Sequence, residues 1–167
     1  NRAIVFEWLI KSKYLKKMVV ISQALKNIYL DKGYLNDSKI QVAHDGADIV
    51  EDFNYKIDLL GFKDNLKVGY VGHLYKGKGM EIIASMADKL DDDVEIHIIG
   101  GLEKDIKFWK NKIIRKNIYF YGFVPHKIVS NYINALDICL LPNQKIILAH
   151  GSDPSNISLN ISSYTSP

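Results

Sequence analysis

The feature that most constrains this chain is a regular alternation of short apolar runs with helical segments between residues 67 and 142. The runs 67–72, 94–101, 118–122 and 137–142 predict strands, and the intervening segments 79–90, 102–115 and 125–136 predict helices. Strands that alternate with helices of about 10–15 residues form βαβ units around a parallel sheet. The runs are almost continuously apolar, which is typical of a sheet covered on both faces. The sequence therefore predicts an α/β fold, a parallel sheet with helices on both faces.

The first fifty residues predict a smaller set of elements of the same kind. A helix is expected over 3–17, a strand over 18–22, a helix over 23–31 and a strand over 39–43, followed by a turn at 44–48. Ser22 is a favourable N-cap for the second of these helices, and Gly33 provides its stop. Residues 50–65 are polar, aromatic and irregular, which indicates a linker between two parts of the chain.

Composition narrows the partners. The 167 residues carry a net charge of +3 without a dense basic stripe, so nucleic acid is not an expected partner, whereas a small anion is compatible. The single cysteine, Cys139, lies in an apolar run and predicts a small buried side chain in a reducing, cytoplasmic compartment. No apolar run approaches the roughly 20 residues that cross a bilayer. Because the chain starts without Met, we expect it to be part of a longer protein.

Glycines follow three of the four predicted strands in the second part of the chain. Gly72, Gly100 with Gly101, and Gly122 stand where these strands end. In an open parallel sheet, ligands bind beyond the carboxyl ends of the strands, and glycine lets a ligand approach the backbone closely. The pattern therefore predicts a ligand site at this edge.

The stretch from Gly72 to Gly79 almost matches the phosphate-binding loop of nucleotide triphosphatases, but Gly79 stands where a magnesium-binding Ser or Thr is required. We therefore reject that motif. A different mode uses the same residues: Lys78 lies at the start of a predicted helix, whose free N–H groups attract an anion, and His73 follows the strand directly. Together they could flank a diphosphate without a metal ion.

These segments resemble a known family. YVGHLYKGKGMEII, IHIIGG, IYFYGFVPHKIVSNYINALDICLLP and the final YTSP resemble the carboxyl-terminal domain of retaining family 4 glycosyltransferases, and residues 19–48 are similar to the end of that family's first domain. The resemblance implies a GT-B fold, in which two Rossmann-like domains face each other across a cleft. It implies that residues 1–49 end the acceptor-side domain, that 50–65 form the interdomain linker, and that 66–167 form a truncated nucleotide-sugar-binding domain.

The resemblance also implies roles for individual residues. Binding of the donor diphosphate is implied for Gly72, His73, Lys78, Thr165 and Ser166. Contacts to the nucleotide are implied for Gly100, Gly101, Gly122, Phe123 and Val124. The family's arginine in the diphosphate element is replaced here by His73, and the asparagine of its Asn-Gly-x-Asp turn is replaced by Asp45.

The family's two glutamates, which hold the donor's sugar and ribose, are absent. The first position falls on Tyr164 and the second lies beyond Pro167, so no catalytic residue is assigned. We expect the fragment alone to be inactive. The remaining histidines are expected to have other roles: His97 is packed or lies at a strand end, and His126 and His150 lie in or near loops at the surface.

The resemblance implies that the full-length protein is a glycosyltransferase that moves a sugar from a nucleotide diphosphate sugar to an acceptor hydroxyl. The nucleotide sugar is a substrate, and no cofactor or metal is expected. The acceptor could be a glycan, a lipid or a small molecule, and peripheral membrane association stays open. Two alternatives remain: a nucleotide-sugar epimerase of the same fold, and a non-catalytic nucleotide-binding domain.

Overall fold

A computed structural model describes residues 2–46, 57–144, 147–148 and 158–159. The chain divides into two compact units: the described residues 2–46 belong to the first, and the described residues 57–144, 147–148 and 158–159 belong to the second. Each unit is described by itself. The domain boundaries expected at 49/50 and 65/66 stay predictions, and the first of them lies outside the described part of the chain.

The first unit is a small βαβ arrangement. Its elements are α1 (Arg2–Ile10), β1 (Met18–Val20), α2 (Gln23–Asp31), the 3-10 helix η1 (Asp37–Lys39) and β2 (Ile40–Val42). Strands β1 and β2 pair in parallel, as the pattern predicts. The Ser22 hydroxyl accepts a hydrogen bond from the Leu25 N–H at 3.1 Å, so the predicted N-cap of α2 is confirmed. Helix α1 is shorter than predicted, because a turn begins at Lys11.

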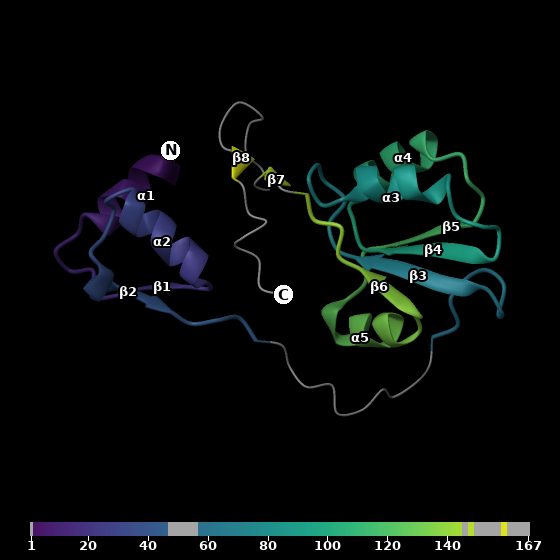
Figure 1. The fold of residues 1–167 in the computed structure, drawn as a ribbon, viewed down its shortest axis with the longest axis horizontal. Helices are drawn as coiled ribbons and strands as arrows, with labels where there is room; N and C mark the ends of the chain where they lie inside the picture. The colour runs from purple at the N-terminus through teal and green to yellow at the C-terminus, as the bar shows by residue number, and fades with distance from the viewer. Residues whose placement is uncertain (1, 47–56, 145–146, 149–157, 160–167) are drawn as a thin grey trace. The chain divides into compact units, whose positions relative to one another are not determined.

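The second unit contains the predicted parallel sheet. Its main elements are β3 (Leu66–Val71), α3 (Met80–Ala87), β4 (Val94–Ile99), α4 (Glu103–Lys112), β5 (Ile118–Gly122), α5 (His126–Asn134) and β6 (Ile138–Leu140). The strands lie in the order β5-β4-β3-β6, all parallel. Helices α3 and α4 cover one face and α5 covers the other (Figure 1). A short antiparallel pair, β7 (Ile147–Leu148) with β8 (Ser158–Leu159), completes the described elements.

The main hydrophobic core lies between the sheet and helices α3 and α4. Alternate residues of the central strands point into it, among them Tyr70 from β3 and Ile96 and Ile98 from β4. Met80 and Ile83 from α3 and Trp109 from α4 close it, and all of these side chains are buried. We call this side of the sheet the α3/α4 face.

The opposite side, the α5 face, contains buried polar groups. Glu95 and His97 on β4 are both fully buried. Glu95 accepts hydrogen bonds from the Phe62 N–H at 2.7 Å and the Asn65 side-chain amide at 3.1 Å. Tyr121 lies 2.9 Å from both the Leu60 N–H and Nδ1 of His97. The α5 face therefore fastens residues 60–65 to the sheet, and His97 is packed in its strand as predicted.

One burial prediction is wrong. Cys139 is exposed rather than buried. The physical reason is the position of β6, which pairs with β3 on one side and is an edge strand of the described sheet. Ile138, in the same short strand, is 46% exposed as well. An apolar run in an α/β sequence does not by itself distinguish a central strand from an edge strand.

Among the helices in the described part of the chain, none is long and apolar enough to cross a membrane.

Candidate functional site

The strand order creates a switch point at the carboxyl ends of β3 and β6. From β3 the chain moves outward through β4 to β5, and then returns to the other side of β3 as β6. The chain therefore diverges to both sides of β3: the connection that leaves β3 passes over α3 on one face, and the connection that enters β6 comes from α5 on the other (Figure 1). In open α/β sheets such a divergence leaves a crevice that binds ligands. The residues that follow β3 and β6 therefore define the candidate site.

The structure brings the three predicted glycine strand ends together. The Gly72 N–H donates to the Ile99 carbonyl at 2.9 Å, and the Gly100 N–H donates to the Gly122 carbonyl at 2.7 Å. A Cβ on Gly100 would overlap the carbonyl oxygen of Gly72, and the positive φ of 108° at Gly100 also favours glycine. These backbones form one glycine-lined edge, which we call the shelf.

The loop 72–79 joins β3 to α3 and is tied to the segment after β6. The Gln144 N–H donates to the Gly77 carbonyl at 3.0 Å. Gly79 has a φ of 93° and lies so close to the Pro142 carbonyl that a Cβ would overlap it. A Ser or Thr is therefore excluded at position 79 on steric grounds as well, which agrees with rejection of the magnesium-binding loop motif.

The two side chains predicted to flank the diphosphate, His73 and Lys78, share one aromatic neighbour. The rings of His73 and Tyr75 have centroids 5.6 Å apart, and Lys78 Nζ lies 5.8 Å from the centroid of the Tyr75 ring. His73 is exposed and Lys78 is half-buried. Two side chains five positions apart in the loop thus lie against the same ring and form one cluster, His73–Tyr75–Lys78, in which Lys78 supplies a positive charge that attracts an anion.

Helix α3 begins directly after this cluster. Gly79 is its N-cap, and the Gly79 carbonyl accepts from the N–H groups of Ile82 and Ile83 at 3.0 Å. The start of a helix carries a partial positive charge from its unpaired N–H groups. The charge of this helix end adds to that of Lys78.

The other residues predicted to bind the donor lie in three different parts of the chain. A Cβ on Gly101 would overlap the Leu74 side chain, so close packing also requires a glycine there. After Gly122, the Phe123 ring is 81% exposed beyond the end of β5, while Val124 is half-buried. Thr165 and Ser166 lie outside the described residues.

Two buried residues that the sequence analysis did not single out form hydrogen bonds to the backbone of the loop 72–79. Buried Tyr70 donates its hydroxyl to the His73 carbonyl at 2.8 Å, and the buried Trp109 indole N–H donates to the Leu74 carbonyl at 3.1 Å. Tyr70 could have been noticed as a hydroxyl in an apolar strand two residues before Gly72. Trp109 gives no such signal, since it lies 35 positions from its acceptor.

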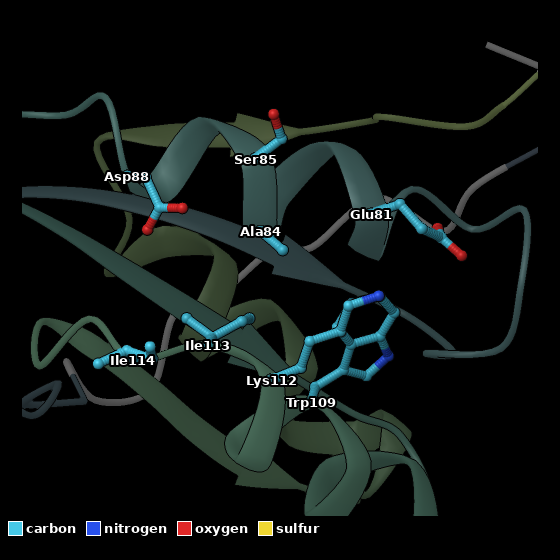
Figure 2. A pocket seen from close by; sticks show the side chains of 8 residues that line it. All are labelled: Glu81, Ala84, Ser85, Asp88, Trp109, Lys112, Ile113 and Ile114. Carbon is cyan, nitrogen blue, oxygen red and sulfur yellow. The ribbon is translucent and has the colours of Figure 1, made fainter.

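A cavity of about 400 Å³ lies elsewhere, between α3 and α4. It is lined by Glu81, Ala84, Ser85, Asp88, Trp109, Lys112, Ile113 and Ile114 (Figure 2). None of the predicted site residues lines it. The switch point and this cavity are therefore distinct places. No group of three or more His, Cys, Asp or Glu side chains suited to a metal ion occurs in the part of the chain that the structure describes.

A parallel sheet with helices on both faces and a glycine-lined switch point defines the class as a Rossmann-like α/β domain. The comparisons give the family: the model of the glycosyl transferases group 1 family matches residues 53–151, and the chain belongs to this family.

Relatives and solved structures agree. An uncharacterized glycosyltransferase of Methanocaldococcus jannaschii, MJ1069, is 30% identical over an alignment of 142 residues, and the match covers 77% of this chain and 35% of that protein. Anabaena HepE in complex with UDP and glucose superposes with a TM-score of 0.59 at 20% identity, over 74% of this chain and 37% of HepE. TarM gives 0.58 at 16% identity, over 80% of this chain and 26% of TarM. These structures show the GT-B type of fold, and the chain spans about a third of such relatives.

Proposed function

We propose that the full-length protein is a retaining glycosyltransferase of family 4 that moves a sugar from a nucleotide diphosphate sugar to an acceptor hydroxyl. In this proposal the second unit binds the donor nucleotide. Membership of the glycosyl transferases group 1 family supports the reaction class. Complexes of the structural neighbour HepE with UDP and with UDP-glucose support the substrate class.

The observation that carries the proposal is the geometry at the switch point. Three glycine strand ends meet at the shelf, and the loop that leaves it carries His73 and Lys78 around Tyr75, directly before the start of α3. A diphosphate needs close backbone approach, positive charge and N–H donors, and these three features occur within one loop and its neighbouring strands.

Each residue then has a physical role. Lys78 and the start of α3 neutralise the charge that develops on the diphosphate as the sugar departs, which is electrostatic catalysis. Thr165 and Ser166 remain proposed donors to the same group. Gly122, Phe123 and Val124 border the base, and the exposed Phe123 ring offers an apolar surface for it. No cofactor or metal is invoked. The proposal keeps a cytoplasmic location.

Calorimetric titration with UDP-, GDP- and ADP-sugars tests the proposal and identifies the base. Lys78→Ala should weaken binding of the nucleoside diphosphate about tenfold or more and leave binding of the nucleoside almost unchanged, because a charged hydrogen bond is lost only with the phosphates. Lys76→Ala, which removes an exposed cation from the same loop, is the matched control. Equal losses for diphosphate and nucleoside in Lys78→Ala would remove Lys78 from the phosphate site.

Product analysis of the full-length protein separates the alternatives. A transferase needs the acceptor for turnover and keeps the anomeric configuration of the donor in the product. Conversion of the donor sugar without an acceptor would identify an epimerase, and binding without any turnover would identify a non-catalytic nucleotide-binding protein.

A further inference from the structure

Two buried side chains from different elements hold adjacent carbonyls of the loop 72–79. Tyr70 lies on β3 and is 3% exposed, and Trp109 lies on α4 and is 4% exposed. The Tyr70 hydroxyl donates to the carbonyl of His73, and the Trp109 indole donates to the carbonyl of Leu74. Leu74 itself is 2% exposed, which fixes the residue between the two bonds. We call Tyr70 and Trp109 together the loop clamp.

The clamp determines which way the loop's peptide groups face. In a planar trans peptide the C=O and the following N–H point in opposite directions. Because the His73 carbonyl points to the Tyr70 hydroxyl, the Leu74 N–H points away from it. The Trp109 bond fixes the next peptide in the same manner. The backbone from His73 to Tyr75 therefore has one set orientation.

Packing alone does not explain the two donors. A phenylalanine would fill the space of the Tyr70 ring, and burying a hydroxyl without a hydrogen bond costs free energy. The hydroxyl is retained where it meets a loop carbonyl. Burial raises the pKa of Tyr70 to about 12, so the hydroxyl keeps its proton and remains a donor at neutral pH.

We infer that Tyr70 and Trp109 are positioning residues that orient the His73–Leu74 backbone and the cluster around it for a diphosphate. The inference rests on the proposed function, because it names the groups that prearrange that site. Neither side chain touches the ligand: both act through the loop. Trp109 also lines the cavity between α3 and α4, as does Glu81 (Figure 2).

Binding of UDP and uridine to single variants tests the clamp. Tyr70→Phe and Trp109→Phe should each weaken UDP about fivefold, the effect of one net hydrogen bond, and leave uridine unchanged. Tyr119→Phe, which removes a hydroxyl from the neighbouring strand β5, is the matched control and should leave both affinities unchanged. A merely structural role would not alter the ratio of the UDP and uridine affinities. An unchanged ratio in both clamp variants, with UDP bound by the wild type, would overturn the inference alone.

A measurement without ligand keeps the test independent of binding. Hydrogen exchange of the Trp109 indole N–H and of the loop amides should be faster in Tyr70→Phe than in Tyr119→Phe. The exposed indole of Trp8, at 70% exposure, supplies an internal unprotected reference. Equal exchange in the two variants would overturn the clamp. Failure of the wild type to bind any of UDP, GDP and ADP would instead overturn the proposed function, and with it the purpose of the clamp.

Discussion

The two faces of the parallel sheet use the same strands in different ways. On β4, Ile96 and Ile98 point to the α3/α4 face and join a core of apolar side chains. The residues that alternate with them, Glu95 and His97, point to the α5 face and are buried to the same degree. One face gains its stability from packing, which is non-directional. The other depends on hydrogen bonds, which hold only when each partner is in place.

The difference teaches what each face contributes. The apolar face supports helices α3 and α4, and so the base of the loop that carries Lys78. The polar face holds residues 60–65 through the Glu95 carboxylate and the Tyr121 hydroxyl. Lys67 adds hydrogen bonds to the carbonyls of Phe62 and Asn65 at 2.8 and 3.2 Å. Damage to the first face should lower global stability, and damage to the second should release a segment.

The largest effect is expected on the apolar face. Ile98→Ala should lower the free energy of unfolding by about 4 kcal/mol, because it leaves a cavity in the core. Denaturant unfolding monitored by circular dichroism measures this. Ile114→Ala, at a side chain that is 94% exposed, is the control and should change it by less than about 0.5 kcal/mol. Similar losses in the two variants would contradict the assignment of the core.

The next effect belongs to the polar face. Glu95→Ala should lower the free energy of unfolding by about 3 kcal/mol, because it leaves the Phe62 N–H and the Asn65 side-chain amide without their acceptor. Glu95→Gln keeps an acceptor oxygen and should cost less. Amide exchange should show protection lost first at Phe62, ahead of β3 and β4. Uniform loss of protection across the sheet would mean that the two faces are not separable.

A third effect depends on pH. Burial lowers the pKa of His97 to about 4, against the opposing influence of Glu95, while Lys67 lowers it further. Above the unfolded pKa of about 6.5 both states are neutral and the full stability is present. Below about pH 6.5 His97 takes up a proton in the unfolded state but not in the folded state. The free energy of unfolding therefore falls as the pH falls towards about 4.

Between about pH 6 and about pH 4.5 this linkage should remove about 2 kcal/mol. His97→Gln should lose this part of the pH dependence, and the difference between the two unfolding curves measures it. Parallel curves for wild type and variant over this window would show that His97 is protonated in the folded state.

The smallest effect is expected for the Tyr119 hydroxyl, which lies on the α5 face but does not hold residues 60–65. Tyr119 stacks on His97 with ring centroids 5.3 Å apart. Tyr119→Phe keeps the ring and should change the free energy of unfolding by less than about 0.5 kcal/mol. A thermal melt of this variant measures it, and a loss as large as that in Glu95→Ala would place the Tyr119 hydroxyl among the groups that hold residues 60–65.

The sequence predicted the apolar face and the shelf for a general reason. Periodicity depends on residues close in the chain, so the strands and helices between residues 66 and 140 could be located. Carboxyl ends of parallel strands share one edge, so Gly72, Gly100 and Gly122 were expected together, and the structure brings them together.

The polar face could not be predicted, because its partners come from distant segments. Glu95 meets Phe62 across 33 positions, and nothing in the run VEIHII indicates that its polar residues are satisfied by residues 60–65. The strand order was equally hidden. Periodicity does not say that β6 returns beside β3, and this produced the wrong prediction for Cys139.

The exposed thiol of Cys139 has a practical consequence. It is the sole cysteine of the sequence, and it lies on β6, whose backbone offers hydrogen bonds along its outer side within the described residues. A maleimide fluorophore would therefore attach at one defined position without any engineered mutation. The emission of the fluorophore would report the docking of another chain along the outer side of β6. The rate at which the thiol reacts would report how accessible that side is.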